Sequence, residues 1–581
     1  ANLYVNSAPN TSAHPACARP PSSMNLRTIV QARPHTACIS AAVVFSLFAL
    51  TMSPSFVPLV GTLAVLLLYG PVLYHRPNTA GHVSLLCLFV TLASTVGRLV
   101  PALSALSDSG QSVAVLLVAS GISSLLAISA VVANVRLSRA GWSQAMVFPA
   151  IWSSLWITLS HMPLGRLTSW SPVTGYSAYE WILPYTGAVG LDWIVAGWAV
   201  VVADAFGLWY MGGGPDPEEG ELLESSRRPE TDKQTSGSML TLGLFLVALT
   251  VPSFLLPSYP TSTDVIESVT PFEVACALPV PQHRDGALTL DDYVDVSKSV
   301  NSRVKIVLWP ESAVKFTSAA QRDDAFAYIR KHIGAAGTYW AVAYEETVTD
   351  PQNLHKTITH NALALLSNAS MEPHLVYYKR NLVPIAESFH ITAGVSPPDM
   401  YTLPLQKPNK VPNQQWGGRT RPLNITAAIC MDFAAPSPFQ DLPSRPSLIL
   451  APARTWDPAI GARMWEEVKL RANELGSVAL WCDGGPGGVG GVAGHGFHDF
   501  YQAGPDGAWS RSLNIPFPFD GRRTLYSRFG DAIILAGSWC LVAGPAGLLA
   551  FRRKGGFFAA QQWIKGRFSR APAEPDRLIE F

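Results

Sequence analysis

Eight long apolar segments limit what this chain can fold into more than any other feature. Seven lie before residue 258 and one lies near the C-terminal end: 37–52, 57–74, 82–101, 111–135, 142–162, 184–210, 238–257 and 531–551. Most of them have the roughly 17–25 residues that an α-helix needs to cross a bilayer. Asp192 and Asp204 interrupt the sixth segment, where a carboxylate is costly in lipid, so they either face a bundle interior or mark a loop. The pattern predicts a multi-pass α-helical membrane bundle.

A low content of charged residues supports a membrane protein with a sizeable soluble part. Charged residues make up 14% of the 581 residues, against about 25% in typical soluble domains. The net charge of +1 gives no indication of nucleic-acid binding. None of the seven cysteines forms a C-x-x-C pair, so neither a zinc site nor a redox dithiol is predicted.

Basic residues orient the predicted bundle. If the N-terminus is cytoplasmic, the inner segments hold most of the arginines and lysines, and the short outer loops add little beyond Arg166. The positive-inside rule then places both termini in the cytoplasm. The long segment after the seventh span forms a soluble domain on the outer face, which is a periplasm, a cell exterior or an organelle lumen. The membrane is a bacterial inner membrane, a eukaryotic endomembrane or a plasma membrane.

The predicted organisation follows from these boundaries. The parts are a disordered N-terminal tail (1–36), a seven-span bundle (37–257) with a flexible charged loop (212–238), a soluble domain (263–528), an eighth transmembrane helix (531–551) and a basic cytoplasmic tail (552–581).

Three segments of the soluble domain carry reactive side chains at expected strand ends. An apolar strand beginning at Val304 ends at Trp-Pro and leaves Glu311 at its tip. The second strand of an expected hairpin delivers Lys379, and the following loop carries Glu387. A third, buried strand ends at Cys430. Reactive side chains commonly sit on loops held by a rigid scaffold, so we predict that these residues meet at one rim of the domain.

Together these residue types fit nucleophilic catalysis by a thiol. A thiol with a pKa of about 8.5 is mostly protonated at neutral pH and needs a base or a cation to activate it. Glu311 can take the proton from Cys430, and Lys379 can hold the oxyanion of a tetrahedral intermediate. Taken singly, each residue has an ordinary structural explanation: a small core residue for Cys430, a turn residue for Glu311 and a solvated strand edge for Lys379.

The order of the segments WPES, YYKRNLVPIAE and ICMDF resembles the nitrilase (carbon–nitrogen hydrolase) superfamily. With seven spans before the domain and one after it, residues 37–552 resemble its membrane branch, the apolipoprotein N-acyltransferase family. The matching segments are Trp309-Pro310-Glu311 for the general base, Tyr378-Lys379-Arg380 for the lysine, Glu387 eight residues later, Ile429-Cys430 for the nucleophile and 470–476 for an Arg-Ala-x-Glu helix.

The resemblance implies an α/β nitrilase-type α-β-β-α sandwich seated on the bundle. It implies catalytic roles for Glu311, Lys379, Cys430 and Glu387, the last orienting Lys379 or an incoming amine. The implied reaction moves a fatty acyl group from a membrane phospholipid, through a thioester on Cys430, to an amine acceptor, which in the family is the N-terminal cysteine of a lipoprotein. No metal or other cofactor is implied. Two alternatives stay open: a membrane-tethered amidase acting on a hydrophobic or lipid amide, and a non-catalytic scaffold that binds lipid or a partner protein.

The sequence departs from the family pattern at three places. Ala386 stands where the family has glycine, Met431-Asp432 where it commonly has Tyr-Glu, and a glycine-rich run follows Trp481. The run from Gly484 to Gly496 lacks the Gly-Lys-Ser/Thr ending of a phosphate loop, so we interpret it as a flexible loop.

Other signals in the domain compete with this interpretation. Cys482 follows a strand-like segment and is a rival nucleophile, although no motif supports it. The histidines lack the spacing of a helical metal pair; they are His355, His360, His495 and His498. Asn368 and Asn424 begin glycosylation sequons, which matter only if the domain faces a eukaryotic lumen.

Overall fold

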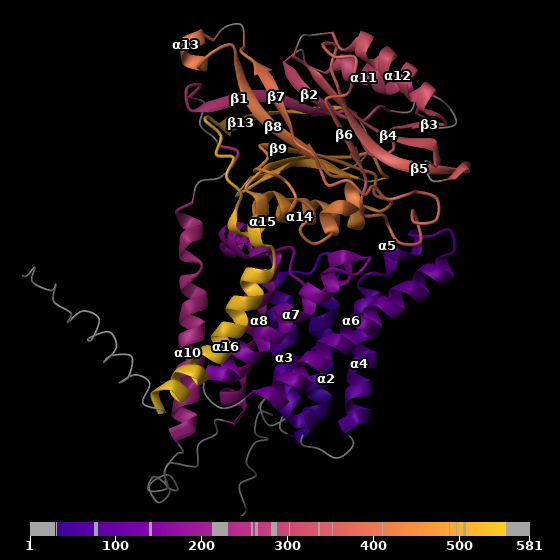
Figure 1. The fold of residues 1–581 in the computed structure, drawn as a ribbon. Coiled ribbons are helices and arrows are strands. Elements are labelled where there is room, and N and C mark those ends of the chain that lie inside the picture. Colours follow the sequence, from indigo (N-terminus) through magenta and orange to yellow (C-terminus); the bar gives the residue numbers. More distant parts are fainter. Residues whose placement is uncertain are drawn as a thin grey trace, which may run out of the picture.

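The computed structural model places a bundle of helices beneath an α/β sandwich (Figure 1). It describes residue 30 and residues 32–74, 79–138, 142–211, 230–256, 259–261, 265–280, 288–300, 303–334, 337–350, 353–408, 411–486, 488–495, 497–503 and 507–553. Three of the predicted features lie wholly or partly outside the described residues: the N-terminal tail as far as residue 29, the first part of the charged loop (212–229) and the basic tail from residue 554.

Eight helices in the described chain coincide with the eight apolar segments. They are α2 (Pro34–Ala49), α3 (Phe56–Tyr74), α4 (Thr79–Val96), α6 (Ser109–Leu137), α7 (Trp142–Ser160), α8 (Leu183–Met211), α10 (Glu230–Ala248) and α16 (Ala532–Arg553). By length and composition, five helical stretches can cross a membrane: Phe56–Tyr74, Thr79–Val96, Ser109–Leu137, Ser177–Tyr210 and Gly237–Phe254. Because α10 begins at Glu230, residues 230–238, which we expected in the flexible loop, are helical.

The bundle is apolar on its outer surface as well as in its interior. Trp152 and Trp156 of α7 are fully buried and pack against Trp170. On the outside, Phe48 is 69% exposed and Val118 is 61% exposed. A helix that is apolar on all sides is either buried in protein or faces lipid, and the described residues do not bury these side chains.

The two aspartates of the sixth segment both lie within α8. Asp192 is fully buried, and its carboxylate is 3.8 Å from the guanidinium of Arg166, which lies on the short 3-10 helix η1 (Gly165–Thr168). Asp204 lies three turns further along and is partly buried. Of the two alternatives left by the sequence, Asp192 therefore faces the interior, and neither residue marks a loop.

The sandwich is built from two mixed sheets. The first has the order β13-β1-β2-β4-β5-β6, with β3 paired to β4, and the second has the order β12-β11-β10-β9-β8-β7. The strands are β1 (Val269–Cys276), β2 (Val304–Leu308), β3 (Val314–Phe316), β4 (Tyr339–Asp350), β5 (Asn353–Leu366), β6 (Leu375–Tyr378), β7 (Tyr401–Gln406), β8 (Thr420–Ala427), β9 (Leu448–Ala453), β10 (Val478–Asp483), β11 (Val489–Gly494), β12 (Phe497–Ala503) and β13 (Trp509–Pro516). The central strands β1, β2 and β4, like β8, β9 and β10, run parallel.

Alternating side chains of the central strands form two separate cores. Ile306 and Leu308 of β2 face the second sheet, whereas Val307 between them faces the outer helices. Those helices are α11 (Leu290–Ser299) and α12 (Ala319–His332), and the second sheet is covered on its far side by α14 (Pro458–Leu475). Strands that are buried on both faces have nearly continuous apolar sequences, and the central strands of this sandwich have such sequences. The layers are helix, sheet, sheet and helix, as the sequence resemblance predicts.

Helix α14 lies at the junction between the sandwich and the bundle (Figure 1). Arg463 on this helix donates a hydrogen bond of 2.9 Å to the carbonyl oxygen of Arg166 in the bundle. The carboxylate of Glu474 accepts one of 2.8 Å from the backbone N–H of Ala188 on α8. Both side chains are fully buried, so polar contacts shielded from water hold the two parts together.

Candidate active site

The structure brings the predicted reactive residues to one edge of the sandwich. Glu311 follows β2 after the Trp-Pro turn, and Lys379 is the first residue after β6. Cys430 begins the short 3-10 helix η4 (Cys430–Ala434), which follows β8 of the other sheet. All three side chains are buried, with exposures of 3%, 1% and 6%. Each lies at the carboxyl end of its strand, which explains why residues far apart in sequence meet.

Lys379 is held between two carboxylates. Its Nζ donates to Oε1 of Glu311 and to Oε1 of Glu387, at 2.7 Å in each case. The other oxygen of Glu387 accepts a 2.7 Å hydrogen bond from the backbone N–H of Val383. Two carboxylates around one ammonium orient the lysine and leave the cluster with an excess of negative charge if both acids are ionised.

Glu311 has further hydrogen bonds that fix its orientation. Asn361 Nδ2 donates to Oε1 at 2.7 Å, and the backbone N–H of Arg454 donates to Oε2 at 3.0 Å. The backbone N–H of Glu311 itself donates to the carbonyl oxygen of Ala453 at 3.3 Å. Donors on both oxygens hold the carboxylate in one position within a nearly dry site.

The electrostatics of the cluster favour a neutral thiol beside a base. Burial raises the pKa of Cys430 well above its usual value, and Glu311 raises it further, whereas Lys379 lowers it. Burial also raises the pKa of Glu311, against the opposing effect of Lys379. Burial alone would lower the pKa of Lys379, but Glu311, Cys430 and Glu387 more than offset that effect and raise it. These shifts favour the charged form of Lys379 and the neutral thiol of Cys430, so Cys430 needs a neighbouring base to lose its proton.

The backbone at Cys430 turns sharply. Its φ of +45° lies in the left-handed region, which is rare for a residue with a side chain. Asp432 stabilises this turn: its Oδ2 accepts hydrogen bonds from the backbone N–H of Ile429 (2.9 Å) and from the hydroxyl of Tyr377 (2.8 Å). Its Oδ1 accepts from the backbone N–H of Asn381 at 2.8 Å. One buried carboxylate thus ties the cysteine turn to the loop that follows Lys379.

Sequence reasoning did not assign roles to Asn361 or Asp432. Both are fully buried polar residues: Asn361 lies within β5, just before its apolar end, and Asp432 lies in η4. Buried polar groups are nearly always hydrogen-bonded. An isolated Asn before Ala-Leu-Ala-Leu-Leu and an acid two residues after Cys430 were therefore the sequence features that could have indicated these two hydrogen-bonding roles.

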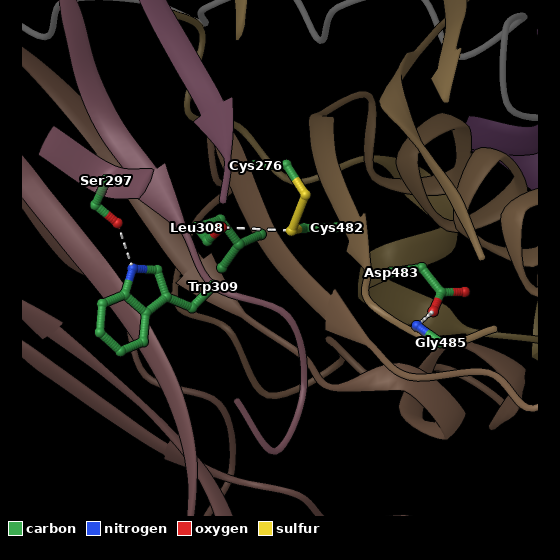
Figure 2. Close-up of a disulfide and its surroundings, with 7 residues drawn as sticks. All are labelled: Cys276, Ser297, Leu308, Trp309, Cys482, Asp483 and Gly485. Carbon is green, nitrogen blue, oxygen red and sulfur yellow. Dashed lines mark hydrogen bonds between the residues drawn. A yellow bond between two sulfur atoms is a disulfide. The ribbon is translucent and has the colours of Figure 1, made fainter. Parts of the chain in front are cut away.

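Cys482 is not a rival nucleophile. It forms a disulfide with Cys276, which joins the ends of β10 and β1 and so links the two sheets (Figure 2). The sulfur of Cys482 lies 3.4 Å from the carbonyl oxygen of Leu308, the last residue of β2. Next to it, Asp483 accepts hydrogen bonds from the backbone N–H and the hydroxyl of Thr455, at 2.9 and 2.6 Å. The disulfide and Asp483 thus support both segments that position Glu311.

The glycine-rich run is not the flexible loop that we expected. Val489–Gly494 forms strand β11, which is buried throughout. A Cβ on Gly485 would lie 1.7 Å from the carbonyl oxygen of Thr455, and one on Gly484 would lie 2.7 Å from Cβ of Pro310. The glycines are needed because backbone segments around Glu311 approach each other closely.

An apolar cavity of about 160 Å³ opens beside Cys430. The sandwich and the bundle both line it: Met52, Arg98, Pro101, Ala102, Ala105, Ser112, Val115, Leu116, Ala119, Leu164, Leu167, Thr168, Val383, Cys430, Met431, Thr455, Trp456, Ile460 and Met464. The indole N–H of Trp456 donates to the carbonyl oxygen of Pro101 on the bundle at 3.2 Å. The nucleophile candidate therefore faces a cavity whose far wall is made of apolar helices.

A second cavity, of about 340 Å³, lies on the other side of Met431. Its lining is more polar and includes His161 after α7, together with Arg380 and Asn381 from the lysine loop. Met431 lines both cavities. The residue after the cysteine thus separates an apolar compartment from a polar one.

The remaining signals from the sequence do not build a second site. Among the described residues, no group of three or more His, Cys, Asp or Glu side chains is arranged to hold a metal ion. His355 and His360 lie on β5. Asn368 donates through its side chain to the carbonyl oxygen of Ile333, and Asn424 accepts from the hydroxyl of Thr402.

Comparisons with known proteins find likenesses among solved structures. A scan against family models gives no match, and a search of curated proteins gives none. The chain is similar to Saccharomyces cerevisiae Nit3, a member of branch 10 of the nitrilase superfamily, with 12% identity over 43% of this chain and 92% of that one and a TM-score of 0.32. It is similar to a carbon–nitrogen hydrolase from Helicobacter pylori G27, with 11% identity over 42% of this chain and 89% of that one and a TM-score of 0.29. It is also similar to an N-terminal amidase, with 13% identity over 36% of this chain and 56% of that one and a TM-score of 0.24. These likenesses are at low identity and cover less than half of this chain, and the three structures named do not show the apolipoprotein N-acyltransferase branch.

Proposed function

We propose that this chain is a membrane-bound acyltransferase that moves a fatty acyl group from a phospholipid, through a thioester on Cys430, to an amine. The observation that carries the proposal is the position of Cys430. It lies beside a buried carboxylate and a buried ammonium, and it faces an apolar cavity walled by helices of the bundle. A hydrolase of small soluble amides does not need an apolar cavity wall formed by the bundle. An enzyme that takes an acyl chain from lipid needs one, because the chain has to be kept away from water.

The apolar exterior of the bundle supports a membrane location. Val115, a cavity residue of α6, is 40% exposed, and its neighbour Leu117 is 44% exposed. We expect an acyl chain to enter the cavity past Val115, which lines the cavity and also belongs to the apolar outer surface of α6. An apolar cavity of about 150 Å³ accommodates a benzene-sized molecule, so this one fits the carbonyl end of an acyl chain and leaves the remainder between the helices.

The disulfide supports a sandwich on the outer face of that membrane. Disulfides persist in oxidising compartments such as a periplasm, an organelle lumen or the cell exterior, and they are rare in the cytosol. Cys276 and Cys482 both lie in the sandwich. This location agrees with the orientation that the positive-inside rule predicts, with both termini in the cytoplasm.

The first half-reaction acylates the enzyme. The Glu311 carboxylate takes the proton from Cys430 as Sγ attacks the ester carbonyl carbon, and the carbonyl oxygen becomes an oxyanion. Lys379 Nζ and the backbone N–H of Met431 stabilise that charge. The ester C–O bond then breaks, Glu311 returns its proton to the departing alkoxide, and a lysophospholipid leaves.

The second half-reaction transfers the acyl group. A neutral amine attacks the thioester carbonyl, and Glu311 takes a proton from the amine nitrogen. The C–S bond breaks, an amide forms, and the thiolate of Cys430 recovers the proton from Glu311. Glu387 keeps Lys379 oriented through both steps. By resemblance, the acceptor is the α-amine of a lipidated N-terminal cysteine. The polar cavity across Met431 offers it a place.

The acceptor assay tests this proposal. The purified protein is incubated with phospholipid and a lipopeptide whose N-terminal cysteine has a free α-amine, and the products are followed by mass spectrometry. We expect the peptide to gain one acyl group, an N-acetylated control peptide to gain none, and Glu311→Gln to be inactive with both. Release of free fatty acid without amide formation would contradict acyl transfer and favour the amidase. A protein that binds lipid without any turnover would favour the scaffold.

A further inference from the structure

The cavity beside Cys430 contains one charged side chain that the proposed reaction does not use. Arg98 follows the end of α4 and is 4% exposed. Its Nε donates to the carbonyl oxygen of Thr51 at 3.3 Å. Its Nη2 has no hydrogen-bond partner among the described residues, and no described carboxylate forms an ion pair with it. A buried cation without a counter-ion is strongly unfavourable.

The surroundings of Arg98 add to its positive charge. Arg463 on α14 is close enough to repel it electrostatically. Arg463 itself is paired with Glu467 through Nη2 at 2.6 Å, whereas its Nε and Nη1 lack hydrogen-bond partners among the described residues. An anion bound in the cavity at Arg98 would supply the counter-ion that Arg98 lacks. A planar guanidinium is well suited to phosphate oxygens.

The position of Arg98 is fixed by close packing. A Cβ on Gly97 would lie 2.8 Å from the carbonyl oxygen of Leu50, so the end of α4 packs directly against the end of α2. Arg98 lies two residues beyond the apolar helix Thr79–Val96 and directly before the short helix α5 (Leu99–Leu103), which lies next to the sandwich (Figure 1). If that helix spans a bilayer, this is the depth at which phospholipid phosphates lie.

We propose that Arg98 binds the phosphodiester anion of the donor lipid and thereby sets the ester carbonyl against Cys430. The inference rests on the proposed function. In a glycerophospholipid the phosphate and the acyl esters hang from the same glycerol, a few bonds apart. One lipid molecule can therefore place its chain in the cavity, its carbonyl at Cys430 and its phosphate at Arg98, which would select phospholipids over neutral esters.

A comparison of two donors tests this role. Dipalmitoyl phosphatidylcholine and dipalmitoylglycerol carry the same acyl esters, but only the first has a phosphate. The rate at which Cys430 is palmitoylated is measured by intact mass in detergent micelles. We expect the wild type to prefer the phospholipid by about tenfold or more, in line with the loss of one charged hydrogen bond. Arg98→Met should abolish this preference by slowing the phospholipid reaction while leaving the diacylglycerol reaction unchanged.

The variants are chosen so that each outcome either supports or contradicts the role of Arg98. Replacing a buried unpaired cation by an apolar side chain is neutral or stabilising, so Arg98→Met should fold with an unchanged or higher Tm. Loss of both reactions, or a large fall in Tm, would show a structural role and overturn the proposal. Arg136→Met changes an arginine 17 residues beyond Ala119 on α6, roughly 25 Å from the cavity, and should keep the preference.

One further experiment and two outcomes of the donor comparison distinguish the ways in which the proposal can fail. If inorganic phosphate inhibits the wild type but not Arg98→Met, and the wild type shows no preference for the phospholipid donor, the site binds free phosphate instead of a lipid headgroup, and the proposal is wrong about its ligand. Equal acylation of the wild type by both donors would overturn the role of Arg98 and leave the acyltransferase standing. Acylation by neither donor would overturn the proposed function itself.

Discussion

Removal of the lysine that bridges the two glutamates is the most informative perturbation of the site. Lys379 Nζ contacts Glu311 and Glu387 at 2.7 Å each, and its side chain is fully buried. Lys379→Met deletes the cation and leaves both carboxylates near each other without it. Loss of one partner from a buried ion pair costs about 3–5 kcal/mol of stability. Loss of one oxyanion donor costs about 10²–10³ in rate, or about 2.7–4 kcal/mol.

The two effects can be separated by measuring unfolding and acylation together. In Lys379→Met we expect a lower free energy of unfolding and a loss of acyl-enzyme formation of at least about 10²-fold in single-turnover experiments. Adding Glu311→Gln removes one of the two carboxylate charges left without the lysine and should recover part of the stability without restoring acylation. Lys315→Met is the matched control, because Lys315 pairs with Glu345 at 2.8 Å on the surface, where such pairs contribute about 0–1 kcal/mol. Normal acyl-enzyme build-up in Lys379→Met would refute the oxyanion role.

Other outcomes follow from the same geometry. Burial raises the pKa of Glu311, and this base works only when it is ionised. The single-turnover acylation rate should therefore fall as pH drops through the raised pKa. A rate that falls only at or below the ordinary glutamate pKa of about 4.3 would contradict this role of Glu311. Ala119→Trp narrows the apolar cavity and should slow palmitoyl donors far more than acetyl donors, whereas equal slowing would argue against an acyl-chain site. Cys276→Ser should lower the free energy of unfolding by about 2–5 kcal/mol, and reductant should destabilise the wild type but not the variant; a reductant-insensitive wild type would show that the cross-link adds no stability.

The apolar helices could be predicted from the sequence because their signal is local. Most of the segments are long enough to be recognised individually as apolar helices, and helices coincide with all eight of them in the described chain. Glu311, Lys379 and Cys430 could be placed together for a related reason. Each follows a short apolar strand, and the carboxyl ends of strands in such a sandwich meet at one edge. The sequence resemblance supplied the pairing of the sheets that a local pattern does not contain.

Features that depend on distant contacts were not predictable from the sequence. Cys276 and Cys482 are 206 residues apart, and their bond exists because parallel strands of two facing sheets end side by side. Gly490 and its neighbours suggested a flexible loop, since glycine weakens strands. In the structure they form a strand that pairs with β10 and β12. Glycine is needed in it because a Cβ on Gly490 would lie 2.8 Å from Nε1 of Trp509. Asp432 is a short-range neighbour of Cys430 in sequence, but its role depends on hydrogen bonds to the lysine loop 51 residues away.

The formation of an acyl-enzyme on Cys430 tests the central proposal most directly. The protein, purified in detergent, is incubated with mixed phospholipids, measured as an intact mass and then mapped by peptide. We predict a fatty-acyl adduct on Cys430 that hydroxylamine releases, that Cys430→Ala lacks and that Cys87→Ala, which removes another free thiol, retains. A folded wild-type protein without an adduct, or an adduct that persists in Cys430→Ala, would contradict the account.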